Sequence, residues 1–154
     1  MSINIKSSDL ESNNINKIFT FNKIIVFFKH TDYHGFVHPY NFFEWTSYVR
    51  EAFFSEVCFG IREILNSPVK MMTAKISGTM HFDSAFGDVI EAQFTVCKIK
   101  RVSFDVIVKF FNKRLRQLAC ETHHTLVFVD SNTQGFTEIP EGIKDAIVRF
   151  QEKE

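Results

Sequence analysis

The stretch from Lys29 to Phe54, KHTDYHGFVHPYNFFEWTSYVREAFF, decides the fold class because a polar turn in it leads into a segment with helical periodicity. Between Tyr40 and Cys58, apolar side chains recur at steps of three and four residues, namely Phe42, Trp45, Val49, Phe53 and Val57. This spacing predicts an α-helix over residues 40–58. Further aromatic residues widen the apolar stripe, so we expect the helix to be covered on several sides.

The turn before this helix carries a carboxylate, Asp32, directly after an apolar run at 23–29 that is typical of a buried strand. Pro39 suits the helix entry, where its missing N–H would have no intrahelical partner. The N-terminus of a helix stabilises an anion. Asp32 can therefore attack an acyl carbon or take a proton from water, while the backbone amides of Tyr40 and Asn41 polarise the carbonyl. The alternative is a turn residue that caps its own loop.

The pattern after Pro68 changes to alternating or continuous β-forming residues. Four strands are expected within the segments 71–82, 88–100, 102–112 and 117–130, and a terminal helix is expected from about Pro140. The links between the strands are short enough for antiparallel hairpins, which predicts a four-stranded meander. A sheet curled around the long helix gives an α+β domain. Because its exposed edge invites pairing with a second copy, we expect a homo-oligomer.

Composition narrows the function classes. Lys+Arg and Asp+Glu both number 18 in 154 residues, so no net field attracts the protein to nucleic acid or to an anionic membrane. Three scattered cysteines indicate reduced thiols and a cytoplasmic location. No run approaches the roughly 20 apolar residues of a membrane span. Residues 1–17 contain few large apolar side chains and are expected to form a loose leader before one domain at 18–154.

Three segments together resemble the 4-hydroxybenzoyl-CoA thioesterase family of hotdog-fold enzymes: TDYHGFVHPYNFFEWTSYVREAFF, FGDVIEAQFTVCKIKRVSFDVIVKF and HHTLVFVDSNTQGFTEIP. The similarity covers about residues 20–145. It implies an antiparallel sheet wrapped around a long central helix, and hydrolysis of an acyl-CoA or acyl-carrier-protein thioester. Asp32 takes the place of the family's catalytic carboxylate and Gly35 that of its following glycine. The resemblance also implies no metal or redox cofactor, and sites built between the subunits of a homodimer or homotetramer.

The chain departs from the family pattern at Pro39, which stands where members usually have a residue whose backbone N–H meets the thioester oxygen. Proline has no such donor. Three alternatives follow: Tyr40 and Asn41 take over the role, the His38 side chain supplies it, or the oxyanion hole is weak. Phe42 is a second departure, since a tyrosine is usual there.

A narrower similarity links NFFEWTSYVREAF to the helix of the thioesterases that release polyene chains from enediyne polyketide synthases, with which Asn41, Trp45, Arg50 and Glu51 align. In that group the loop acid is replaced by asparagine, and the helix arginine is assigned the catalytic role. Asp32 therefore favours acid-dependent chemistry, with Arg50 as a second catalytic candidate. The alternative for Arg50 is a surface ion pair with a nearby glutamate.

Two further groups of polar residues are candidate binding sites. Lys113 and Arg114 belong to a basic cluster that suits the phosphates of CoA, although charged hairpin tips often serve only solubility. The histidines at 30, 34 and 38 have the spacing of a helix face, but Gly35 and Pro39 interrupt any such helix, so no metal site is predicted.

These observations predict a cytoplasmic acyl-CoA thioesterase that uses a loop aspartate and helix N-terminal amides, with Gly35, His38 and Pro39 beside the substrate. The alternatives are an acyl-carrier-protein thioesterase of a polyketide or fatty-acid pathway, and a non-catalytic acyl-CoA binding module. The acyl group and the choice between dimer and tetramer stay open.

Overall fold

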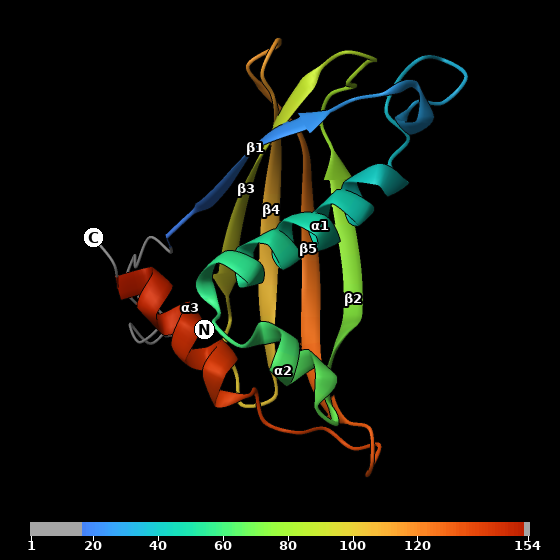
Figure 1. The fold of residues 1–154 in the computed structure, drawn as a ribbon. Helices are drawn as coiled ribbons and strands as arrows, with labels where there is room; N and C mark the ends of the chain where they lie inside the picture. The colour runs from blue at the N-terminus through green and yellow to red at the C-terminus, as the bar shows by residue number, and fades with distance from the viewer. Residues whose placement is uncertain (1–16, 153–154) are drawn as a thin grey trace, which may run out of the picture.

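The computed structural model describes residues 17–152, which form one antiparallel sheet and three helices (Figure 1). The elements follow in the order β1 (Phe19–Ile25), a 3₁₀ turn (Phe28–His30), α1 (Tyr40–Val57), α2 (Ile61–Asn66), β2 (Val69–Met80), β3 (Val89–Cys97), β4 (Ser103–Asn112), β5 (Gln117–Asp130) and α3 (Glu141–Glu152). Helix α1 lies across one face of the sheet, and α2 and α3 lie near the C-terminal end of α1 (Figure 1). The expected α+β class and the long helix against a sheet are confirmed.

The strand order is β1-β3-β4-β5-β2, so the predicted four-stranded meander is wrong for its first strand. Strand β2 pairs with β5 at the far edge instead of forming a hairpin with β3. The segment 81–88 crosses the end of the sheet, where the amides of His81 and Phe82 donate to the Ala119 carbonyl at 2.8 and 3.2 Å. A short link thus joins two strands that are not neighbours in the sheet. The length of a link alone does not show whether the strands it joins are paired.

Two local features differ from those expected, and a third lies outside the described residues. The first strand lies at Phe19–Ile25 rather than at 23–29, because the chain turns into the 3₁₀ segment Phe28–His30 before the loop. The short helix α2 was not predicted. The leader expected at 1–17 falls, except for Lys17, outside the described residues.

The core lies between α1 and the sheet. On β3 and β4 buried and partly buried residues alternate, so one face of each strand turns toward the helix. Phe53 of α1 is fully buried, and its ring lies 4.8 Å from that of Phe94 on β3. The opposite side of α1 exposes Glu44, Tyr48 and Glu51, so this helix is less completely covered than expected.

Strand β2 is an edge strand that the rest of the chain leaves largely uncovered. All of its residues from Met72 to Met80 are exposed, although β5 pairs with the strand along almost its whole length. Met72, Ile76 and Met80 are 52%, 49% and 41% exposed. Within residues 17–152, no helix has both the length and the apolar character needed to cross a membrane.

Candidate active site

The loop before α1 holds the Asp32 carboxylate in a defined position. One carboxylate oxygen, Oδ1, accepts hydrogen bonds from the backbone amides of His34 at 2.9 Å and Phe36 at 3.3 Å. Gly35 adopts φ +83°, a conformation that glycine reaches without the strain of a side chain, and its amide donates to the Asp32 carbonyl at 3.0 Å. The second oxygen, Oδ2, has no hydrogen-bond partner within the described part of the chain. Asp32 therefore caps its own turn and still offers a free oxygen.

This loop is tied to two other segments. The Val37 amide donates to the Ser84 carbonyl at 2.8 Å, which joins the loop to the 81–88 crossover. The Asn41 side chain is buried, and its Nδ2 donates to the His30 carbonyl at 2.8 Å and the His38 carbonyl at 3.1 Å. Asn41 thus joins the two ends of the loop that carries Asp32, a structural role that the sequence analysis did not foresee.

The amides at the start of α1 are less free than expected. Pro39 is the N-cap residue in helical conformation, and no side chain caps the helix. The Asn41 amide already donates to the His38 carbonyl at 3.0 Å. The Tyr40 amide makes only a long contact of 3.4 Å to Nδ1 of His38. Of the two predicted oxyanion donors, Tyr40 is therefore the more available one.

A cavity of about 370 Å³ opens beside this loop. Its lining includes Asp32 and Pro39 of the loop, Phe42 of α1, and Met80 and Phe82 at and just after the end of the edge strand β2. Met80 and Phe82 are 41% and 51% exposed, so the cavity borders the open edge of the sheet. An anionic oxygen, the start of a helix and apolar side chains meet here, which suits a substrate with a polar reacting group and an apolar body.

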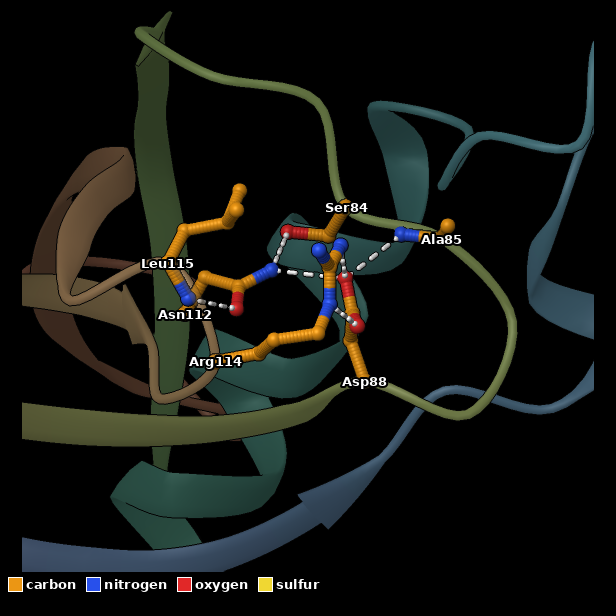
Figure 2. A network of polar contacts seen from close by, with 6 residues as sticks. All are labelled: Ser84, Ala85, Asp88, Asn112, Arg114 and Leu115. Carbon is orange, nitrogen blue, oxygen red and sulfur yellow. Dashed lines mark hydrogen bonds and ion pairs between the residues drawn. The ribbon is translucent and has the colours of Figure 1, made fainter.

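A buried polar network fixes the crossover that supports this loop (Figure 2). The Asp88 carboxylate accepts from Nε of Arg114 at 2.6 Å, from Nη2 of Arg114 at 3.0 Å, from Nδ2 of Asn112 at 2.7 Å and from the Ala85 amide at 2.9 Å. These hydrogen bonds lower the pKa of Asp88 to about 2, and those from Arg114 have the largest effect. Nδ2 of Asn112 also donates to Oγ of Ser84 at 3.1 Å, so the network holds the residue to which Val37 binds.

Arg114 therefore has a structural role, because Asp88 binds two of its guanidinium nitrogens, and the phosphate contact stays a prediction. Lys113 lies exposed in the same turn between β4 and β5. Asp88 belongs to the segment FGDVIEAQFTVCKIKRVSFDVIVKF, which enters the sequence analysis only through its resemblance to the family. A buried acid before a strand and an arginine after the next strand are the signal that could have suggested this pair.

Arg50 lies apart from the Asp32 cavity, in the second half of α1. Its side chain is only 12% exposed, Nη2 lies 3.5 Å from Oε1 of Glu51, and Nη1 donates to Oγ1 of Thr73 on β2 at 3.3 Å. Burial lowers the pKa of Arg50. The structure thus shows the predicted ion pair with a glutamate, but in a largely buried setting, and it does not bring Arg50 together with Asp32.

The three loop histidines have different surroundings. His30 is buried, its Nδ1 accepts from the Phe27 amide at 2.9 Å, and its ring packs edge-on against Trp45. His34 and His38 are exposed, and the His38 ring lies 4.8 Å from that of Tyr40. Among residues 17–152, no three His, Cys, Asp or Glu side chains are grouped as metal ligands would be.

Known proteins resemble the chain in family and in fold. The family model of the thioesterase-like superfamily matches residues 26–147. A hypothetical protein from Staphylococcus aureus, solved in complex with CoA, has a TM-score of 0.80 at 16% identity, with 89% of this chain and 85% of that chain covered. A 1,4-dihydroxy-2-naphthoyl-CoA thioesterase from Synechocystis gives 0.79 at 16% identity, over 86% of this chain and 96% of that chain.

The dynemicin thioesterase, whose crystal structures describe polyene binding, has a TM-score of 0.80 at 14% identity over 87% of this chain and 97% of its own. Among curated proteins, no sequence matches the chain. At these low identities the solved structures establish the shared architecture, a hotdog fold.

Proposed function

The chain belongs to the thioesterase-like superfamily and is a thioesterase of hotdog fold, and from this premise we propose that it hydrolyses acyl-CoA thioesters at the cavity beside Asp32. One observation carries the proposal. Two backbone amides hold Oδ1 of Asp32, Oδ2 has no hydrogen-bond partner within residues 17–152, and Asp32 lines a cavity at the start of α1. A carboxylate oriented in this way is prepared to act on a bound carbonyl group.

Two chemical routes are open to Asp32. As a general base it takes a proton from water, the water oxygen attacks the thioester carbon, and the C–S bond breaks to release the thiol. As a nucleophile its free oxygen attacks the same carbon and expels the thiol, and water then cleaves the acyl–aspartyl anhydride. In either route, the Tyr40 amide is the proposed donor to the carbonyl oxygen as negative charge develops there.

Replacing Asp32 by Asn tests the proposal directly. We expect kcat for thiol release to fall by roughly 10²- to 10⁴-fold, with little change in melting temperature, because an amide oxygen can still accept from the loop amides. An unchanged kcat would remove Asp32 from the mechanism. In single-turnover hydrolysis in ¹⁸O-water, a label on the Asp32 carboxylate identifies the nucleophilic route with attack of water at the aspartyl carbonyl of the anhydride, because the general-base route leaves both Asp32 oxygens unlabelled.

The second part of the proposal concerns the thiol to which the acyl group is attached, either CoA or a carrier protein. The Staphylococcus aureus neighbour was solved with CoA, and the Synechocystis neighbour is described as a CoA thioesterase. This supports acyl-CoA as the substrate class here. The alternative, an acyl-carrier-protein thioesterase, predicts faster thiol release from an acyl group on a carrier protein than from the same acyl-CoA.

A non-catalytic acyl-CoA binding module is a specific alternative, because Pro39 has no N–H and the Asn41 amide is already engaged. Such a module would bind acyl-CoA to saturation without releasing free thiol. Measuring binding and thiol release on the same sample distinguishes the two functions.

We further propose that two copies pair along β2. The exposed edge of a sheet presents unpaired backbone groups, and pairing would cover Met72 and Ile76. It would also close the Asp32 cavity at Met80, one of the exposed side chains lining it. Light scattering should show a dimer or larger oligomer, and Ile76→Lys should shift it to monomer with reduced turnover. A monomeric, fully active wild type would exclude this arrangement.

A further inference from the structure

Two polar side chains in the interior lack the partners that buried groups normally have. His124 of β5 is fully buried, and neither ring nitrogen has a hydrogen-bond partner within residues 17–152. Nε of Arg50 is also buried and unpaired in this part of the chain. Buried polar groups in proteins are almost always hydrogen-bonded, so two exceptions close together need an explanation.

The two residues belong to a polar strip between α1 and the sheet, made of Thr46, Arg50, Thr122 and His124. Thr46 and Arg50 are four residues apart and lie on one side of α1. Thr122 and His124 are two residues apart on β5, so both face the helix. The hydroxyl oxygens of Thr46 and Thr122 are 2.5 Å apart. The pKa of the His124 imidazole is lowered to about 4, first by burial and then by the positive charge of Arg50.

The polar strip contacts the edge strand β2 directly, through Arg50 and Thr73, and also through one aromatic side chain. The Phe43 ring stacks over His124, with ring centres 6.4 Å apart and planes at 28°. On its other side it touches β2 so closely that a Cβ on Gly78 would lie 3.0 Å from the ring. His124 is also the register partner of Ile76, which is 49% exposed. The polar strip therefore lies one strand away from the open edge of the sheet.

Phe43 lies next in sequence to a residue that lines the Asp32 cavity. Phe42 and Met80 line that cavity, Phe43 follows Phe42 on α1, and Gly78 precedes Met80 by two residues on β2. From Phe43 to Arg50 the helix rises by about 10 Å. An acyl chain that enters from the cavity would therefore have to displace the Phe43 ring, which stacks over His124 and contacts β2, to reach the polar strip.

The ligand chemistry follows from the unpaired atoms. Nε of Arg50 is a donor, and a neutral His124 offers one donor and one acceptor nitrogen. An alkyl chain would leave all of them unpaired, whereas an oxygen can accept from both side chains. We infer that Arg50 and His124 determine substrate specificity by hydrogen-bonding an oxygen atom in the distal part of the acyl group. This inference rests on the proposed thioesterase function.

The test compares thiol release from pairs of acyl-CoAs that share a carbon skeleton and differ by one distal oxygen group. One arm of the panel carries a hydroxyl group and the other a carboxylate, which distinguishes a neutral from an anionic oxygen. The wild type should prefer the oxygenated member of at least one pair by on the order of 10- to 100-fold in kcat/KM, as expected for hydrogen bonds to a charged group.

Arg50→Met and His124→Leu should each reduce that preference to within about threefold. The matched controls, Arg62→Met on exposed α2 and His123→Leu on the opposite face of β5, should keep the wild-type preference. The melting temperature of His124→Leu should equal or exceed the wild-type value, because the change removes an unpaired buried group. Arg50→Met also loses the contacts to Glu51 and Thr73, so its melting temperature is measured only to show that it folds. If one of the two variants does not fold, the other decides the outcome.

Three results would overturn the inference. In the first, the wild type hydrolyses both members of every pair equally, as expected if water fills the polar strip. The proposed thioester hydrolysis would then be retained, and the proposed specificity rejected. Arg50→Met could lower kcat equally for both members, which would make Arg50 part of the catalytic step. Finally, no thioester on the panel could be hydrolysed, in which case the proposed function fails and this inference fails with it.

Discussion

The Asp88 network makes a quantitative prediction about stability and pH. The carboxylate of Asp88 is only 4% exposed, and its pKa is about 2 against an ordinary value of 3.8. A difference of roughly two pKa units corresponds to about 2.5 kcal/mol of preference for the ionised form in the folded state. Because the folded pKa is the lower one, this stabilisation is present above the unfolded pKa and is lost as the pH falls toward the folded pKa.

Replacing Asp88 by Asn should therefore lower the free energy of unfolding by about 2–3 kcal/mol at pH 7, which is the scale of hydrogen bonds to a charged group. The difference between wild type and variant should narrow by about 1 kcal/mol at pH 3 and by about 2 kcal/mol at pH 2. Urea unfolding of both proteins at these pH values measures the narrowing. Asp83→Asn, an exposed acid of the same crossover, is the matched control and should change little.

A difference that stays constant from pH 7 to pH 2, or one below about 0.5 kcal/mol at pH 7, would refute the reasoning. Arg114→Met provides an independent check, since the double variant should lose clearly less than the sum of the single variants if the two side chains stabilise each other. Because the crossover also binds the Asp32 loop through Ser84 and Val37, folded Asp88→Asn should show a reduced kcat as well.

Other changes test the loop, the core and the thiols. Gly35→Ala should cost about 1–2 kcal/mol in urea unfolding through its positive φ alone, since no atom lies within 4 Å of the added methyl group; an unchanged stability would contradict that conformation. Phe53→Ala should cost about 3–5 kcal/mol in the same assay, and a loss below 1 kcal/mol would mean that the ring is not a core residue. Burial raises the pKa of the Cys120 thiol to about 12, so a thiol reagent at pH 8 should label Cys120 only after unfolding; rapid labelling of the native protein at this residue would be the contrary result.

Local periodicity predicted much of the fold. Helix α1 begins at Tyr40 and ends at Val57, close to the expected 40–58, because apolar residues at steps of three and four form one face of a helix wherever it packs. Strands β3, β4 and β5 also lie within their predicted segments, since alternating burial leaves a period of two in the sequence. The sequence did not predict which strands pair at every position, because the short 81–88 link is compatible with a hairpin as well as with a crossover.

The candidate site divides in the same way. The position of Asp32 in a turn before a helix was readable from residue types, and so was the doubt that Pro39 raises about the oxyanion donors. The interaction of Arg114 with Asp88 was not, because these residues lie 26 positions apart and meet only when β4 and the crossover are in place. The burial of His124 beside Arg50 likewise depends on the packing of α1 against β5.

By itself the sequence determined what is local: a capped aspartate turn, an amphipathic helix rich in aromatic residues and strands with alternating burial, since each follows from the chemistry of residues a few positions apart. The tertiary structure alone decided which strand became the open edge, which charges found partners and which polar side chains were left without one. Those outcomes depend on contacts between distant segments, where burial sets the strength of each interaction.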